Sequence, residues 1–301
     1  MVKKSGIENV TDHVWILHDR MLPLYVIRSE KNFLIDCSVM AKAPWIEKNL
    51  IQFLKGEKID SVLLTHSHYD HVGACSRLQE KFHFNIMASQ RTKEILENPD
   101  AIEFIDRMNR EFQKILRTDS PGSTFTRPQD IIAVQEGDRI PVSAEKHIQV
   151  YETPGHTRCS LSFLLEPEKI LFVGDASGVM EKTGINKPLF LSSYVQYEAS
   201  LQKIIGLKVR LLALPHNSYI QGTQEVDDYL TRSLQAARSF KKEILEALEK
   251  STDYEKIAQR ILAREFTSPT LMGPKEAMLI NVMSMVRVVH REFGKKSAQT
   301  D

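Results

Sequence analysis

The most constraining feature of this sequence is a cluster of three histidines and one aspartate directly after a short apolar run. Val62–Thr65 has the length and composition of a buried strand, and residues 65–71 read Thr-His-Ser-His-Tyr-Asp-His. A turn leaving a strand brings His66, His68 and Asp70 to one side, and the bend into a helix expected over Val72–Lys81 adds His71. Imidazole and carboxylate groups are ligands of zinc and neighbouring transition metals. The heptad therefore predicts two metal half-sites that share one loop.

Three more candidate ligands follow later apolar runs in the same way. The strand expected at His147–Tyr151 precedes His156, the one at Ile170–Val173 precedes Asp175, and the one at Arg210–Leu214 precedes His216. Each alone has an ordinary explanation in local turn chemistry. Together with the heptad they indicate one site at the edge of a sheet. The candidate metal ligands are His66, His68, Asp70, His71, His156, Asp175 and His216.

The remaining patterns predict an α/β body followed by helices. Short apolar runs predict consecutive antiparallel strands at Val14–Leu17, Leu24–Ile27 and Phe33–Ile35, and helical spacing predicts a helix over Ala43–Leu54. Helices divided at Pro99 and a loop rich in Ser, Thr, Pro and Gly (Thr118–Asp130) make an insertion at about residues 90–130. After residue 222 only helical patterns follow. We expect a catalytic domain at 1–222 and a helical C-terminal region at 223–301.

Bulk composition favours a globular protein of the cytoplasm. The 301 residues carry a formal net charge of +1, which gives no overall attraction to nucleic acid or to an anionic membrane. The three cysteines, Cys37, Cys75 and Cys159, are too few and too scattered for a disulfide framework. We expect a small-molecule substrate, no nucleic acid and no membrane as partners, and consider a homodimer.

The ligand-bearing motifs resemble those of the metallo-β-lactamase superfamily, from about Val14 to Gly222. The resemblance implies a four-layer αββα sandwich, here with a helical C-terminal extension. It also implies that His66, His68 and His156 surround one metal, that Asp70, His71 and His216 surround the other, and that Asp175 bridges both. The cysteine ligand of some true β-lactamases is replaced by Asp175, which favours other hydrolase branches, those of the hydroxyacylglutathione hydrolase or lactonase type.

The charges of such a site suit hydrolysis. Two carboxylates and a bridging hydroxide against two divalent ions leave a charge of about +1, which stabilises an oxyanion. Coordination lowers the pKa of water toward ~7, and Asp70 or Asp175 accepts or passes a proton. We therefore expect a binuclear metallohydrolase whose metal-bridging hydroxide attacks a small ester, thioester or lactone. Zinc is the expected ion, with iron and manganese as alternatives.

Three other functions stay open on these residues. A persulfide dioxygenase resembles the same ligand pattern but uses one iron and consumes oxygen. A nuclease or phosphodiesterase would use the same metals, although no long basic insert accompanies them. A partner-binding protein that kept its metal site is the non-enzymatic alternative.

Some residues near these motifs have two explanations. A hydroxyl of Tyr194 or Tyr197 would polarise a substrate carbonyl, although packing is the simpler role. Phe104, Met108 and Phe112 would line a hydrophobic substrate mouth, or pack against the body as core.

Overall fold

The structure is a computed structural model that describes residues 6–19, 21–116, 124–180, 186–216, 218–265 and 274–294. Its contacts divide the chain into two compact units. Unit 1 comprises Met1–Glu152, Cys159–Gly174 and Lys208–Val226, and unit 2 comprises Thr153–Arg158, Asp175–Leu207 and Asp227–Asp301. The expected division at residue 222 stays a prediction. In the expected loop Thr118–Asp130, residues 118–123 lie outside the described part of the chain.

Unit 1 contains two mixed β-sheets. The seven-stranded sheet has the order β1-β2-β3-β4-β5-β6-β7, and the six-stranded sheet has the order β15-β14-β11-β10-β9-β8. The strands of the first are Gly6–Thr11, Val14–His18, Leu24–Ile27, Phe33–Ile35, Ser61–Leu63, Asn85–Ala88 and Ile131–Ala133. Those of the second, from β8 to β11 and then β14 and β15, are Arg139–Pro141, His147–Glu152, Leu161–Glu166, Ile170–Phe172, Leu211–Ala213 and Tyr219–Gln221.

A shared apolar core lies between the inner faces of the two sheets. Tyr25 and Leu63 of the first sheet belong to the same buried cluster as Val150, Phe163 and Phe172 of the second. Strand β10 supplies Leu161, Phe163 and Leu165 to this cluster, the alternation of a strand with one face on a core. The two sheets therefore pack face to face.

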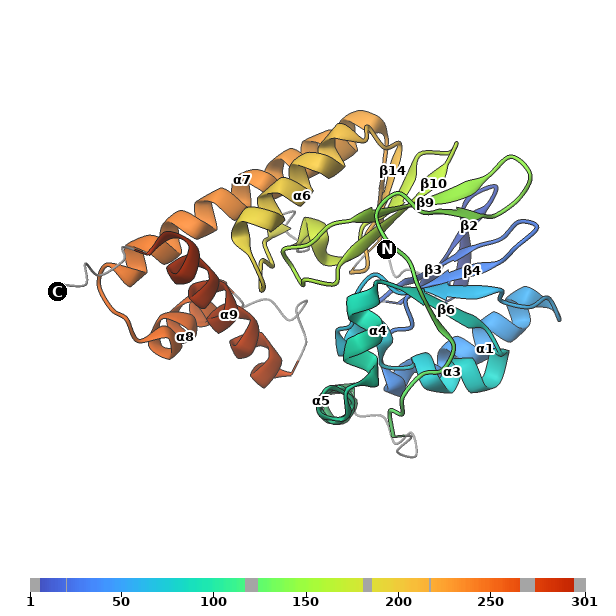
Figure 1. Cartoon of the computed structure of the whole chain (residues 1–301), viewed down its shortest axis with the longest axis horizontal. Helices are drawn as coiled ribbons and strands as arrows, with labels where there is room; N and C mark the ends of the chain where they lie inside the picture. Colours follow the sequence, from blue (N-terminus) through green and yellow to red (C-terminus); the bar gives the residue numbers. More distant parts are fainter. Residues whose placement is uncertain are drawn as a thin grey trace. The chain divides into compact units, whose positions relative to one another are not determined.

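Helices cover the outer face of the seven-stranded sheet. They are α1 (Ala43–Leu54), α3 (Cys75–Phe82), α4 (Gln90–Glu97) and α5 (Pro99–Leu116). Ile46 and Leu50 of α1, with Leu78 of α3, pack in one cluster with Val26 and Val62 of the strands. Figure 1 shows α1, α3 and α4 on the side of this sheet away from β9 and β10.

Strand order explains where the expected ligands emerge. Strands β4, β5 and β6 pair in parallel, as do β11 and β14, so their carboxyl ends point the same way within each sheet. Leu161 N donates to Thr65 O at 2.8 Å and so joins the start of β10 to the end of β5. The loops after β4, β5, β11 and β14 therefore all begin at the end of the two sheets where this hydrogen bond lies.

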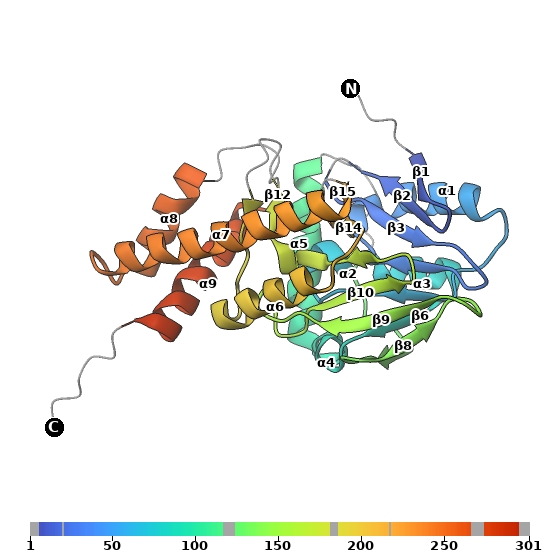
Figure 2. The same cartoon turned by 90° about the horizontal axis from the view of Figure 1, so that it is seen from above.

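Unit 2 is mainly helical. It holds the two-stranded ribbon of β12 (Val179–Met180) and β13 (Asn186–Lys187), helix α6 (Tyr194–Gly206), most of α7 (Thr223–Leu248), α8 (Tyr254–Glu265) and α9 (Lys275–Phe293). Figure 2 shows α7 as one long helix. Glu292 of α9 accepts hydrogen bonds from Tyr194 N and Val195 N and so caps the start of α6. In the described residues, no helix combines the length and apolar character that crossing a membrane requires.

Candidate metal centre

Five of the seven expected ligands converge in unit 1. His66 leaves the end of β5, while Asp70 and His71 lie in the short helix α2 (Tyr69–Val72) that begins after His68. The ring centroids of His66 and His68 are 4.6 Å apart, and those of His66 and His71 are 4.0 Å apart. The loop between β14 and β15 adds His216, whose ring centroid lies 5.8 Å from that of His71.

Asp70, His71 and His216 form a compact group within unit 1. One ligand atom of each lies within 4.8 Å of those of the other two. His71 is buried, while the side chains of Asp70 and His216 are each 18% exposed. Two imidazoles and a carboxylate, partly open to solvent, are a donor set suited to zinc and similar ions with positions left for other ligands.

Hydrogen bonds at the far side of the rings orient them for metal binding. His71 Nδ1 lies 2.8 Å from Asp36 Oδ2, and His216 Nδ1 lies 3.3 Å from Met21 O. Both partners are acceptors, so each Nδ1 carries the proton and leaves the lone pair on Nε2. This tautomer is the one that binds a metal through Nε2.

The carboxylate of Asp36 is the functional residue that the sequence reasoning missed. It accepts from Thr65 N at 2.8 Å, from the Thr65 hydroxyl and from His71. Asp36 has φ +57°, and its own N–H donates to Leu63 O at 3.0 Å. The available signal was its place directly after the expected strand Phe33–Ile35, the position from which the other ligands emerge.

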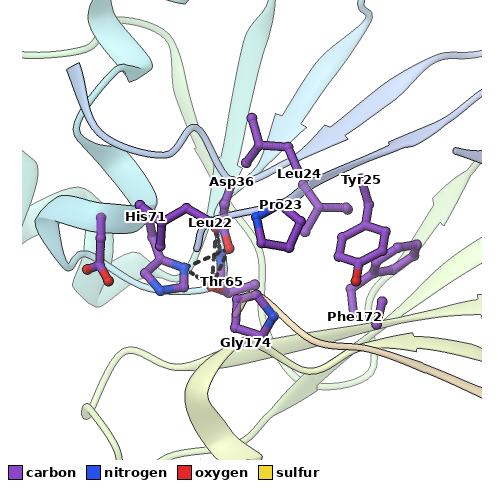
Figure 3. A pocket seen from close by; sticks show the side chains of 13 residues that line it. Leu22, Pro23, Leu24, Tyr25, Asp36, Thr65, His71, Phe172 and Gly174 are labelled. Atoms are coloured by element: carbon purple, nitrogen blue, oxygen red, sulfur yellow. Dashed lines mark hydrogen bonds and ion pairs between the residues drawn. The ribbon is translucent and has the colours of Figure 1, made fainter. Parts of the chain in front are cut away.

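A small cavity lies beside this group. Its volume is about 20 Å³, the room for one water, and its polar lining is Asp36, Thr65, Asp70 and His71. Figure 3 shows Asp36, Thr65 and His71 joined by hydrogen bonds next to Leu22 and Pro23. The nearby hydroxyl of Tyr25 is within hydrogen-bond distance of Leu214 O and Ser218 O, and so holds the loop of His216 against β3.

The remaining two expected ligands come together in unit 2. His156 Nε2 lies 3.2 Å from Asp175 Oδ2, and both side chains are buried. His156 Nδ1 donates to Leu189 O at 2.7 Å, which leaves the Nε2 lone pair available, as in His71 and His216. Asp175 lies in a short 3-10 helix, Gly174–Ser177, directly after β11 and Val173.

The five residues weighed for substrate contact are largely buried. In unit 2, Tyr194 and Tyr197 are 1% and 0% exposed, and burial, with a smaller contribution from the charge of Asp175, raises the pKa of Tyr197. In unit 1, Met108 and Phe112 are also buried, whereas Phe104 is 41% exposed. Packing is thus the principal role of four of these five residues.

Comparisons with known proteins identify the family of this chain. A model of the metallo-beta-lactamase superfamily matches residues 23–216, more than half of the chain. The metallo-beta-lactamase fold-containing protein ST1585 of Sulfurisphaera tokodaii is 26% identical over 204 residues, which cover 65% of this chain and 73% of that protein. A hydroxyacylglutathione hydrolase of Rhodopseudomonas palustris is 26% identical over 121 residues, which cover 40% of this chain and only 35% of the relative.

Solved structures show the same fold. The metallo-beta-lactamase family protein TTHA1429 from Thermus thermophilus has a TM-score of 0.69 at 17% identity, with 95% of each chain covered. The expected α/β fold with C-terminal helices is thereby confirmed. This chain belongs to the metallo-beta-lactamase superfamily.

Proposed function

We propose that this protein is a binuclear metal-dependent hydrolase of a small ester, thioester or lactone. The observation that carries the proposal is the group of Asp70, His71 and His216, with ligand atoms within 4.8 Å of one another. Both imidazoles have Nδ1 bound to an internal acceptor, so the donor set fits a divalent metal ion. We propose zinc as that ion, with iron or manganese as alternatives.

Chain connectivity supports a second metal position built from His66, His68, His156 and Asp175. Cys159 Sγ lies 3.5 Å from the Oγ of Ser67, which stands between His66 and His68 in the chain, and His156 is only three residues before Cys159. Asp175 directly follows Gly174, where an added Cβ would lie 2.9 Å from Thr65 Cβ. Because each residue extends the chain by at most ~3.6 Å, both ligands are tethered close to the heptad.

Divalent ions held by these residues would lower the pKa of coordinated water toward ~7 and stabilise negative charge on a carbonyl oxygen. The protein's own groups orient the reaction. Asp36 fixes the tautomer of His71, and the Asp70 carboxylate, 18% exposed, is placed to accept a proton from water or pass one to the leaving group. The hydroxyacylglutathione hydrolase relatives make thioesters the first class to assay.

Metal analysis and a substrate panel test this function. The purified protein should contain about two divalent ions per chain and hydrolyse at least one member of a panel of thioesters, lactones and aryl esters. His68→Ala and Asp175→Ala should each lower bound metal and abolish turnover. One iron per chain together with oxygen uptake would show that the protein is an oxygenase and not a hydrolase of this kind. Cleavage of phosphodiesters alone would show that it is a nuclease.

We propose further that the protein acts in the cytoplasm on a small molecule, without nucleic acid or membrane as partner, and a homodimer is the assembly that we consider. Size-exclusion chromatography with light scattering tests the oligomeric state.

A further inference from the structure

An apolar surface lies next to the Asp70, His71 and His216 group in unit 1. Three chain segments contribute to it: the loop after β2, helix α2 and the end of α5. We define the apolar wall as Met21, Leu22, Tyr69, Phe112 and Leu116. Leu22 and Phe112 are buried and form its base, while Met21, Tyr69 and Leu116 are only partly buried and form its surface.

The wall is continuous with the ligands of the candidate metal centre. Tyr69 directly precedes Asp70 in the chain, and Met21 O accepts the hydrogen bond of His216 Nδ1. Leu22 lines the same small cavity as Asp70 and His71. A substrate with one part bound to Met21, Tyr69 and Leu116 would therefore place another part close to Asp70 and His216.

The segments that carry the wall are held firmly. The carboxylate of Asp19 accepts from Met21 N and Leu22 N, both at 2.9 Å, and pairs with Lys42. On the other side, Asn109 of α5 accepts from Met40 N at 2.8 Å, and the rings of Tyr69 and Phe112 lie 6.2 Å apart. The wall is thus a preformed surface whose own side chains carry no charge.

Several charged side chains near the wall, among the residues that the structure describes, are paired within the protein. Besides the Asp19–Lys42 pair, Asp106 of α5 pairs with Arg110, and Glu111 pairs with Lys114 at 2.6 Å. An anionic group placed on the described side chains of the wall would lose hydration, and these side chains carry no charge to compensate, which is unfavourable. An alkyl group placed there would gain from its removal from water.

We propose that the apolar wall binds the acyl chain of the substrate, so that the protein prefers esters, thioesters or lactones of apolar acids with an alkyl chain over those of acetic acid. This inference rests on the proposed hydrolase function and narrows its substrate class. It makes Met21 and Leu116 specificity-determining residues, outside the set of metal ligands.

A chain-length series on the metal-loaded protein tests the proposal. kcat/KM is measured for p-nitrophenyl esters of acetic, butyric, hexanoic and octanoic acids, and for thioesters of the same acids. Each methylene that the wall covers should raise kcat/KM by up to about four-fold. The variants Leu116→Asp and Met21→Asp should lower the octanoate-to-acetate ratio of kcat/KM by about ten-fold or more.

The matched control is Ile51→Asp, because Ile51 lies on α1 of the same unit and is 49% exposed. This control should keep the octanoate-to-acetate ratio of the unsubstituted protein. A ratio near or below one in the unsubstituted protein, or a ratio unchanged in both wall variants, would overturn the proposal while leaving hydrolysis in place. Failure to hydrolyse any ester, thioester or lactone would instead remove the proposed function, and this inference with it.

Discussion

At the scale of single residues, Asp36 determines how His71 presents its ring. The carboxylate accepts from Thr65 N and from His71 Nδ1, both at 2.8 Å, and is itself 5% exposed. A buried carboxylate can only accept, so it selects the tautomer of His71 with the proton on Nδ1. The geometry of one candidate metal ligand therefore depends on a residue outside the candidate ligand set.

Asp36→Asn should weaken metal binding while preserving the fold. Asparagine tolerates the left-handed backbone at φ +57° and still accepts from Thr65 N through its carbonyl oxygen. Its amide nitrogen then faces His71 Nδ1 and favours the tautomer with the proton on Nε2, which opposes coordination. We expect about 10- to 100-fold lower zinc affinity, measured by competition with a chelating dye.

The control for Asp36→Asn is Asp12→Asn, which changes an exposed carboxylate in the turn before β2 and should leave zinc affinity unchanged. Circular dichroism checks that both variants are folded. Equal affinity in Asp36→Asn and the unsubstituted protein would show that the Asp36–His71 hydrogen bond does not position the ligand.

At the scale of elements, the sequence predicted the buried strands well and the marginal strands poorly. The runs Leu24–Ile27 and Phe33–Ile35 are strands with every residue buried, so their apolar character marks their bounds. Strand β1 was missed because Gly6–Thr11 is polar and partly exposed at an edge of its sheet. The short strands β8 and β15 were missed because their composition does not mark them as strands. Only their pairing with β9 and β14 identifies them.

The candidate site likewise has residues with a strong signal in the sequence and residues with a weak one. The heptad identified four positions because dense clustering of histidine is informative by itself. A single acid after a strand, as at Asp36, is common, and only the hydrogen bonds of Asp36 to Thr65 and His71 reveal its role. The expected single helix over Val72–Lys81 is instead two, α2 and α3, separated at Gly73–Ala74.

Gly73, at that break, fits α5 closely against the loop of the candidate metal ligands. A Cβ added there would lie 2.2 Å from Tyr69 O and 2.5 Å from Asn109 Oδ1. Gly73→Ala should therefore force a backbone shift and destabilise the protein by about 1–3 kcal/mol, the usual range for overpacking. The thermal midpoint should fall by several degrees.

Gly206→Ala is the matched control, because Gly206 ends α6 and no atom lies within 4 Å of its added Cβ. It should leave the midpoint unchanged or raise it slightly, since alanine favours the helix. A midpoint for Gly73→Ala equal to that of Gly206→Ala would contradict the close packing of α5 on this loop.

At the scale of the whole molecule, metal removal tests whether ligands from both units hold the same ions. Binding to the folded state alone stabilises by RT ln(1 + [L]/Kd), about 2.7 kcal/mol at 100-fold excess over Kd. For units of this size, chelation should lower the thermal midpoint by roughly 5–10 °C. If His156 and Asp175 share metals with the heptad, the unfolding of both units should shift together.

His216→Ala provides the comparison for chelation, because it removes one ligand of unit 1 and leaves His156 and Asp175 in place. Its midpoint should respond less to EDTA than that of the unsubstituted protein. If the chelated protein loses its metal but keeps the thermal midpoint of the metal-loaded protein, metal binding does not stabilise the fold. That result would contradict a centre shared by ligands of both units.

The charge of the whole chain separates a small-molecule hydrolase from a nuclease. The formal net charge is +1, so no long-range field should steer an anionic polymer to the site. For a neutral ester, kcat/KM should change by less than about two-fold between 50 and 500 mM salt, because screening acts only on charged partners. An enzyme that contacts six or more phosphates of a single strand would lose about 300-fold or more in affinity between 50 and 200 mM. Measuring ester hydrolysis and single-stranded RNA binding over this range decides between the two, and RNA binding with such a steep salt dependence would favour the nuclease.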